Sequence, residues 1–304
     1  MQLPRGQGSA TGRSMDSVME TGLRPVSQTG TAFEIAAGAS RATRWRLAGE
    51  DIVQGIRHWR LCWILAWLDI KLRYRGSVLG PFWLTLSTAL MVGAMGAIYA
   101  NLFNINLHDY LPFLVLSLVL WGFISQVVID GCGSFVQSES MIRSMRMPFL
   151  LYAGRIVLRN MLILAHNVLV IVGVFLLLRI GIGWVALLSV PAFLVWLIDG
   201  VAICLLLGAL CARFRDIPPI VASLMQMIFF VTPIIWRPEL IGPKHQWVMP
   251  FNPIYVLLAV VREPLLGIVP SAMVYVSATI YSALLLVATA LLFARVRGRI
   301  AYWV

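Results

Sequence analysis

Long apolar runs recur along the chain and constrain its fold more than any other feature. Each run is about twenty residues long, enough for an α-helix to cross a bilayer hydrocarbon core of about 30 Å. Only 12% of the residues are charged, whereas about 25% are charged in a typical soluble domain. We therefore predict an all-α integral membrane protein.

Six apolar runs lie between polar or proline-containing connections, which predicts six transmembrane helices. The fifth run is the shortest, with about sixteen residues that give roughly 24 Å of helix. It reaches the far face only with help from the residues that follow it. The predicted spans are Pro81–Phe103, Leu111–Cys132, Arg155–Leu178, Val185–Leu210, Ile220–Ile235 and Ala272–Ala294.

The arrangement of basic residues predicts the orientation, because Lys and Arg beside short loops remain preferentially in the cytoplasm. With six spans, one side carries Arg57, Arg60, Lys71, Arg73, Arg75, Arg143, Arg146, Arg155, Arg159, Arg213, Arg215, Arg295, Arg297 and Arg299. The other side carries only Arg179, Arg237, Lys244 and Arg262. Both termini are therefore predicted to be cytoplasmic, and the net charge of +11 is explained by topology and not by a nucleic-acid-binding face.

Two further segments are predicted to lie at the membrane without crossing it. Glu50 to Lys71 is predicted to be an N-terminal amphipathic interface helix, because its apolar centre, Leu61–Leu68, is too short to span and is flanked by charged residues. The proline-rich connection from Trp236 to Pro270 is predicted to form a pair of re-entrant helices between spans five and six. An amphipathic periplasmic loop is the alternative.

The chain divides into two regions by composition. Residues 1–45 are rich in Gly, Ser and Thr and lack an apolar stretch of signal-peptide length, so we predict an uncleaved, disordered cytoplasmic tail. Residues 50–300 are predicted to form the transmembrane domain.

Residues that bind metals or act in catalysis do not cluster in the sequence. The four cysteines and four histidines are isolated, without the spacing of metal ligands, so we expect no metal site and no catalytic residues. Asp199 is different, because an acidic side chain near the centre of a span costs about 2.5–3.5 kcal/mol on insertion scales. We expect Asp199 to face protein or water. Asp130 lies near the inner end of its span and was predicted to need no such explanation.

Four short motifs, in this order, resemble ABC-2 type permeases that export O-antigen, capsule and teichoic-acid chains. They are Lys71-Leu-Arg-Tyr-Arg-Gly-Ser-Val-Leu-Gly-Pro-Phe-Trp83, Arg213-Phe-Arg-Asp-Ile217, Thr232-Pro233 and Asn252-Pro-Ile254. The resemblance covers residues 50–300. It implies a homodimeric channel in the bacterial inner membrane, joined to two nucleotide-binding subunits, that exports a polysaccharide built on a polyprenyl pyrophosphate.

The sequence independently indicates where ATP does not bind. A P-loop needs Gly-x-x-x-x-Gly-Lys-Ser/Thr, and neither Lys71 nor Lys244 is preceded by glycine. We expect no cofactor in this chain, with ATP bound by the partner subunit.

Cationic residues flank the predicted interface helix and are candidates for binding the substrate. Guanidinium groups pair bidentately with phosphate oxygens, so this group of residues is predicted to contact the substrate's pyrophosphate. The alternative is snorkelling towards lipid headgroups. The candidates are Arg57, Arg60, Arg73, Tyr74 and Arg75.

Aromatic residues in and beside the spans fit either helix packing and interfacial belts or stacking against sugar rings in a channel. With Asp199, the channel-lining candidates are Trp83, Tyr99, Trp121, Phe229, Phe230 and Trp236.

The segment Gln137 to Pro148 is predicted to form a helix of about two and a half turns, with Ser138 as its cap. The family resemblance implies that such a helix docks in a cleft of the ATPase; an interfacial loop helix is the alternative. The ATPase-coupling candidates are Met141, Arg143, Met145 and Arg146, with Arg213, Arg215 and Asp216 of the second motif, which more simply fix a turn.

Two other function classes remain as alternatives. An integral-membrane glycosyl or acyl transferase needs ionisable groups that converge at one face of the membrane. An ion-coupled lipid flippase typically has several buried charges or an internal repeat, and the sequence has no evident repeat.

Overall fold

The computed structural model describes residues 41–77, 80, 82–145, 147–242 and 246–304. Within these residues all regular structure is helical. The predicted tail lies outside the described residues up to position 40. Helix α2 (Arg41–Arg57) begins at Arg41, so the last five residues of the predicted tail are helical.

Five helices in the described part of the chain are long and apolar enough to cross a membrane. They are α4 (Phe82–Leu102), α5 (Leu107–Cys132), α7 (Phe149–Leu177), α8 (Ser189–Arg213, preceded by the 3-10 turn η3, Trp184–Leu188) and α11 (Ala272–Trp303). The fifth predicted span corresponds to α9 (Ile217–Val231), which has 15 residues and is too short to count with the others.

Helix α5 forms the centre of the bundle. It packs against α4, α7 and α8, and 67% of its most apolar stretch is buried, compared with 11% for α4. A helix that is apolar on all sides is suited to this central position. Helices α4 and α9 are buried much less than α5. Only 11% of the most apolar stretch of α4 is buried, and Met225 is the one buried residue of α9 in the described part of the chain.

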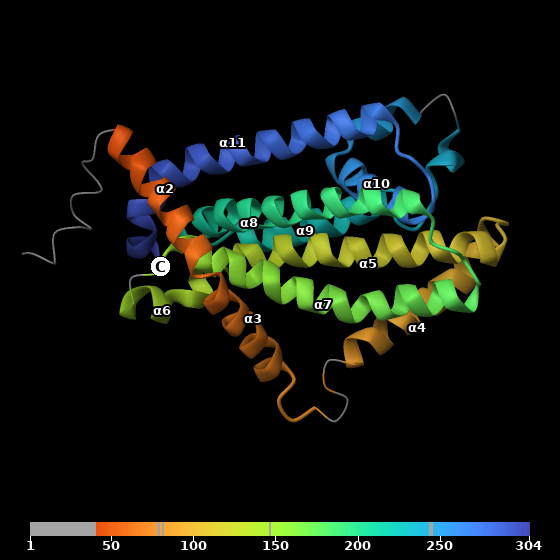
Figure 1. The fold of residues 1–304 in the computed structure, drawn as a ribbon, viewed down its shortest axis with the longest axis horizontal. Coiled ribbons are helices and arrows are strands. Elements are labelled where there is room, and N and C mark those ends of the chain that lie inside the picture. Colours follow the sequence, from red (N-terminus) through yellow and green to blue (C-terminus); the bar gives the residue numbers. More distant parts are fainter. Residues whose placement is uncertain (1–40, 78–79, 81, 146, 243–245) are drawn as a thin grey trace, which may run out of the picture. The chain divides into compact units, whose positions relative to one another are not determined.

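The long helices of the bundle run between two ends, at which different elements meet (Figure 1). At one end, which we call the basic end, α5 finishes at Cys132 in a cluster with Cys211 of α8, and Arg297 of α11 pairs with α2. At the other, the loop end, the Tyr110 hydroxyl donates to the carbonyl of Ile235 and a ring nitrogen of His108 lies 3.1 Å from the Leu178 carbonyl.

The predicted interface helix is in fact two helices, α2 and α3 (Trp59–Arg73), which break at His58. Helix α3 buries one stripe at four-residue spacing, Cys62, Ala66 and Ile70, and exposes tryptophans on its remaining surface. Helix α2 packs tightly on α7, since a Cβ at Gly55 would lie 2.5 Å from Cβ of Leu150. The amphipathic pattern was predicted from the sequence, but the break was not.

One α-helix and two 3-10 turns take the place of the predicted pair of re-entrant helices. They are η4 (Pro238–Ile241), η5 (Gln246–Phe251) and α10 (Pro253–Leu265). Asn252 caps α10, because its side-chain oxygen accepts hydrogen bonds from the N–H groups of Ile254 and Tyr255.

Candidate functional site

A chain of ion pairs crosses the basic end and begins on the interface helix α3. Asp69 accepts hydrogen bonds from Nε of Arg155 at 2.7 Å and from Nη2 of the same residue, and Nη1 of Arg159 lies 3.6 Å from Asp69. The Asp69 side chain is only 12% exposed. The planar fork of Arg155 matches the two carboxylate oxygens, which fixes the orientation of α3 against α7.

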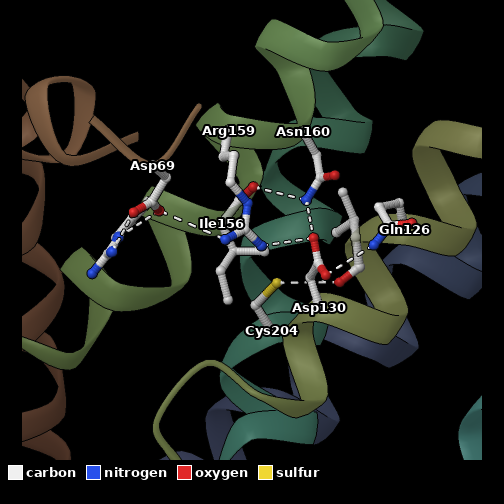
Figure 2. A network of polar contacts seen from close by, with 9 residues as sticks. Asp69, Gln126, Asp130, Ile156, Arg159, Asn160 and Cys204 are labelled. Carbon is white, nitrogen blue, oxygen red and sulfur yellow. Dashed lines mark hydrogen bonds and ion pairs between the residues drawn. The ribbon is translucent and has the colours of Figure 1, made fainter. Parts of the chain in front are cut away.

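The series of ion pairs continues from α7 to the central helix α5 (Figure 2). Nη2 of Arg159 donates to Asp130 at 2.7 Å, and Nδ2 of Asn160 donates to the same oxygen at 3.0 Å. Gln126 donates to the other oxygen of Asp130 at 2.9 Å. Cys204 of α8 lies beside this group, with its thiol 3.7 Å from the carbonyl of Val127.

The network joins two carboxylates with two guanidinium groups, so their formal charges cancel. These residues are Asp69, Asp130, Arg155 and Arg159. Removing one partner of a buried pair costs about 3–5 kcal/mol, since the other charge is left unpaired. The prediction that Asp130 needs no explanation was therefore wrong. Arg155 and Arg159 act here as structural partners of Asp69 and Asp130.

A second buried acid connects three helices at the basic end. Asp51 of α2 is 1% exposed, accepts from the backbone N–H of Leu150 at 3.1 Å and accepts from Nε of Arg297 at 3.0 Å. Leu150 lies in the first turn of α7, where backbone N–H groups lack partners within the helix and a negative charge is favourable. Asp51 therefore ties α2 to the start of α7 and to α11.

The predicted substrate-binding cations fall into two groups. Arg57 and Arg60 lie at the α2–α3 junction, whereas Arg73 and Arg75 lie at the far end of α3, and all four are exposed. Arg73 lies thirteen positions after Arg60 on α3, about 20 Å at a rise of 1.5 Å per residue. The structure does not bring the two groups together around one phosphate.

Tyr74 belongs to the second of these groups. Burial raises the pKa of its phenol above the ordinary value, against a smaller opposing effect of Arg73. The hydroxyl therefore remains a hydrogen-bond donor at neutral pH, beside two arginines.

The predicted coupling segment is shorter than expected. A 3-10 turn, η2 (Val136–Ser138), leads into α6 (Glu139–Ser144), and Ser138 makes no capping hydrogen bond, so the predicted cap and length were wrong. Met141 packs against the core, whereas Met145 has extended backbone beyond the helix and is 47% exposed.

Charged side chains hold α6 in place. Arg143 pairs with Glu139 at 2.8 Å and donates to the carbonyl of Val304 at 2.7 Å. The remaining candidate of this segment, Arg146, lies outside the described residues.

The second group of coupling candidates forms the exposed connection between α8 and α9. The guanidinium of Arg213 lies 5.6 Å from the Phe214 ring centroid, and Arg215 and Asp216 are exposed. Asp216 makes no ion pair with either arginine, although all three residues are described by the structure. These side chains are therefore unengaged with one another at the basic end.

Four of the predicted channel-lining aromatics form one cluster on α5, α9 and the residues after it. Trp121 lies 5.9 Å from Phe229, and Phe229 lies 5.2 Å from Phe230, between ring centroids. Nε1 of Trp236 donates to the carbonyl of Phe230 at 3.1 Å. The other two candidates, Trp83 and Tyr99, lie on α4, where Tyr99 stacks on Phe103 with 5.7 Å between ring centroids.

Asp199 faces protein, as expected from the cost of exposing it to lipid. It is 7% exposed, and Oδ2 accepts a hydrogen bond from Ser282 of α11 at 2.6 Å. Within the described residues Oδ1 has no hydrogen-bond partner, and Asp199 lines a cavity of about 150 Å³ together with Trp196. The structure therefore places Asp199 between α8 and α11 and not on an exposed face.

Two of the sequence motifs meet at the loop end. Nδ2 of Asn252 donates to the hydroxyl of Thr232 at 3.2 Å, and Thr232 is fully buried. The carbonyl of the adjacent Pro233 accepts from Nη1 of Arg262 at 2.8 Å. These contacts attach α10 to the end of α9.

Arg262 was counted only as an outer-side cation in the sequence, but it is 1% exposed. Nη1 also donates to the Ser117 hydroxyl of α5 at 2.9 Å, and the guanidinium carbon lies 4.4 Å from the Phe113 ring centroid. The arginine thus joins α10, α9 and α5 through hydrogen bonds and a cation–π contact. This role of Arg262 had no signal in the sequence, because its partners Ser117 and Pro233 belong to separate segments of the chain.

Metal binding has no support among the residues that the structure describes, where no group of three His, Cys, Asp or Glu side chains could hold an ion.

Comparison with known proteins identifies the family. The family described as ABC-2 type transporter matches residues 60–266. The chain is 22% identical over 198 residues to an O-antigen export system permease protein RfbA of Klebsiella pneumoniae, covering 64% of this chain and 76% of the relative. A second K. pneumoniae protein of that name is 21% identical over 189 residues, 61% and 72% of the two chains.

A protein of the same name from Myxococcus xanthus is 26% identical over 176 residues, covering 55% of this chain and 65% of the relative. With its series of long apolar helices, the chain is a multi-pass protein of the bacterial inner membrane. Because the family match covers more than half of the residues, the chain belongs to the ABC-2 type transporter family.

Proposed function

We propose that this chain is the permease subunit of an ABC transporter that exports a polysaccharide of the O-antigen or capsular type across the inner membrane. The observation that carries the proposal is the family match over residues 60–266, which runs from the start of α3 through α10. The relatives named as O-antigen export permeases match 198 and 189 residues of this chain. The function is that of a transport subunit and not of an enzyme.

A topology of six crossings with both termini in the cytoplasm fits this function. Helix α9 begins next to the end of α8 at the basic end, and the residues that follow it reach Tyr110 at the loop end. After α8 the chain thus passes from the basic end back to the loop end. Helix α9 is too short to make this crossing alone, and residues Thr232–Trp236 complete it. Since basic residues favour the cytoplasm, the basic end is cytoplasmic.

A homodimer would cover the two poorly buried helices. Helix α4 exposes Phe82, Trp83, Leu86 and Leu90, and α9 exposes Leu224, Met227 and Phe230. Helix α9 also exposes Ser223 and Gln226, polar side chains that favour protein or water over lipid. A second copy of the chain against α4 and α9 would place the cluster of Trp121, Phe229, Phe230 and Trp236 beside a path for sugar rings.

The ATPase partner would dock at the cytoplasmic surface formed by α6 and the α8–α9 connection. Met145, Arg213 and Arg215 are exposed there. The chain lacks a P-loop, so ATP binding and hydrolysis belong to that partner.

The substrate would be a polysaccharide linked to polyprenyl pyrophosphate. Arg73 and Arg75 flank the Tyr74 phenol at the end of α3 that leads into α4. Two guanidinium groups with an intervening hydroxyl donor suit the oxygens of a pyrophosphate at the membrane surface. Arg57 and Arg60 lie too far away to hold the same group.

The family match and the named relatives favour neither the enzyme nor the flippase alternative. A transferase would need a carboxylate free to act as a base, and both Asp69 and Asp130 are occupied by arginines at the basic end. Asp199 accepts from Ser282 in the interior of the chain.

Deletion and complementation in the source bacterium test this function. Loss of the gene should remove the surface polysaccharide while its lipid-linked form accumulates inside the cell, and a plasmid copy should restore export. If the polymer is no longer synthesised at all in the deletion strain, the chain acts in assembly and the export proposal fails.

A further inference from the structure

An apolar groove of about 770 Å³ lies at the basic end between the interface helices and the bundle. Side chains of α2, α3, α7, α8 and α11 line it, among them Ile52, Trp59, Leu158, Ile198 and Ala290. Its volume is within the range of about 300–1,000 Å³ that is usual for ligand sites. The groove is separate from the cluster of aromatics on α5 and α9.

The groove has the length of a lipid chain in one leaflet. Its lining extends from Leu150 to Leu158 on α7 and from Leu197 to Leu205 on α8. Eight residues of helix measure about 12 Å, and half of a hydrocarbon core is about 15 Å. The groove therefore reaches from the basic end towards the middle of the membrane.

The polar groups in the lining are already engaged. The Thr289 hydroxyl donates to the carbonyl of Ala202 at 3.2 Å, and the Cys62 thiol lies 3.6 Å from the carbonyl of Leu151. The remaining lining is almost entirely apolar, which suits a hydrocarbon chain and disfavours a sugar or a phosphate.

Two cations lie at the rim of the groove. Arg57 directly follows Ile56, which lines it, and the guanidinium carbon of Arg60 lies 5.7 Å from the ring centroid of Trp59, which also lines it. Neither arginine makes an ion pair with a carboxylate of the described residues. Cations at this surface attract anionic headgroups, by about 1 kcal/mol each.

We propose that this groove binds one anionic glycerophospholipid of the cytoplasmic leaflet, with an acyl chain between the interface helices and the bundle and its phosphate at Arg57 and Arg60. The lipid would fill the space between the bundle and helices α2 and α3. The position of these two helices would then depend on the lipid composition of the membrane. The site stands apart from Arg73 and Arg75, about 20 Å along α3. It does not depend on which polymer is exported.

A photoactivatable phosphatidylglycerol with a diazirine in its acyl chain tests the site in nanodiscs that contain the full-length protein. Ultraviolet light should produce adducts on α8 and α11, near Ile198 and Ala290. Unlabelled phosphatidylglycerol should compete with the probe, and phosphatidylcholine should not. Replacing Arg60 by Gln should weaken the competition about fivefold, the equivalent of one cation at about 1 kcal/mol.

Two tryptophan variants of α11 provide a matched pair. Ala290→Trp places an indole in the groove and should abolish the adducts, because the space is filled. Ala288→Trp, at an exposed position of α11 that does not line the groove, should leave the adducts unchanged. If Ala290→Trp fails to insert, the Arg57→Gln and Arg60→Gln variants still test the headgroup preference.

Several results would overturn the proposal. A phosphatidylcholine probe that labels α8 and α11 equally well would indicate only surrounding bulk lipid. Stronger competition by polyprenyl pyrophosphate than by phosphatidylglycerol would assign the groove to the substrate. Unchanged preference for phosphatidylglycerol in the Arg57→Gln, Arg60→Gln double variant would remove the two arginines from the site and the proposal with them.

Discussion

Arg159 of α7 and Asp130 of α5 lie 29 positions apart in the sequence, with 2.7 Å between Nη2 and Oδ2. The same guanidinium also reaches Asp69 of α3. One side chain thereby joins the interface helix to the central helix of the bundle. The position of α3 is therefore linked to that of α5 through direct side-chain contacts.

Breaking this network at Asp69 should destabilise the protein. Asp69→Asn removes the negative charge to which Arg155 donates two hydrogen bonds. Hydrogen bonds to charged groups contribute about 1.5–3 kcal/mol to the stability of the folded state. We expect a lower midpoint of thermal unfolding in detergent, measured by fluorescence-detected gel filtration. The exchange of both residues, Asp69→Arg with Arg155→Asp, should recover part of the loss. Asp216→Asn, at an exposed and unpaired acid, serves as control, and an equal effect there would contradict the role of the network.

Arg262 should be the most sensitive cation of the loop end. Arg262→Gln loses the charge beside Phe113 and shortens the reach to Ser117 and Pro233, so α10 should detach more readily from α5 and α9. A destabilisation of about 1.5–3 kcal/mol is expected, the usual contribution of hydrogen bonds that involve a charged group. Limited proteolysis of the connection after α9 reports it directly. Arg179→Gln, at an exposed arginine of the same end, should have little effect, and similar cleavage of both variants would refute the prediction.

Met145 should contribute to ATPase binding. Because it is exposed and lies beyond α6, Met145→Asp should preserve folding but reduce co-purification of the ATPase, whereas Met145→Leu should retain it. Met141→Asp is a poorer test, since Met141 packs against the core. If the ATPase co-purifies normally with the Met145→Asp variant, Met145 is not needed for docking, and Arg213 and Arg215 become the candidates for this role.

The dimer surface can be tested with a pair of glycines. A Cβ built at Gly93 of α4 or at Gly173 of α7 meets no atom of the same chain within 4 Å. Gly93→Trp should therefore fold but shift the purified protein from dimer to monomer, while Gly173→Trp should leave the dimer intact. Multi-angle light scattering in detergent distinguishes the two masses. A dimer of unchanged stability in Gly93→Trp would exclude α4 near this residue from the interface.

The double replacement Arg73→Gln, Arg75→Gln tests the substrate contact. Membrane insertion should be normal, because many other basic residues remain on the cytoplasmic side. Surface polysaccharide should fall while the lipid-linked polymer accumulates inside. Wild-type amounts of surface polymer from a well-expressed double variant would leave these arginines with a topological role only.

Apolar runs in the sequence predicted the long helices of the bundle. The long helices α4, α5, α7, α8 and α11 lie where the apolar runs do, because hydrocarbon forces the backbone to satisfy its hydrogen bonds within each helix. Boundaries were less predictable: α7 begins at Phe149, six residues before the predicted Arg155, since Arg155 and Arg159 find partners inside the protein.

Tertiary partners were the part that the sequence could not predict. Nothing local connects Asp69 with Arg155, or Asn252 with Thr232, because each pair depends on how separate helices pack. The motifs themselves were informative, and Thr232-Pro233 and Asn252-Pro253 prove to be neighbours. The break at His58 had no proline or glycine at that position to mark it.

ATP hydrolysis by the reconstituted complex is the most direct test of the central claim. The permease, co-expressed with its candidate ATPase and placed in nanodiscs, should yield a complex that hydrolyses ATP and responds to its lipid-linked polysaccharide. The permease alone should show no hydrolysis. A permease that forms no complex with any such ATPase, yet transfers or modifies the polymer unaided, would contradict the account.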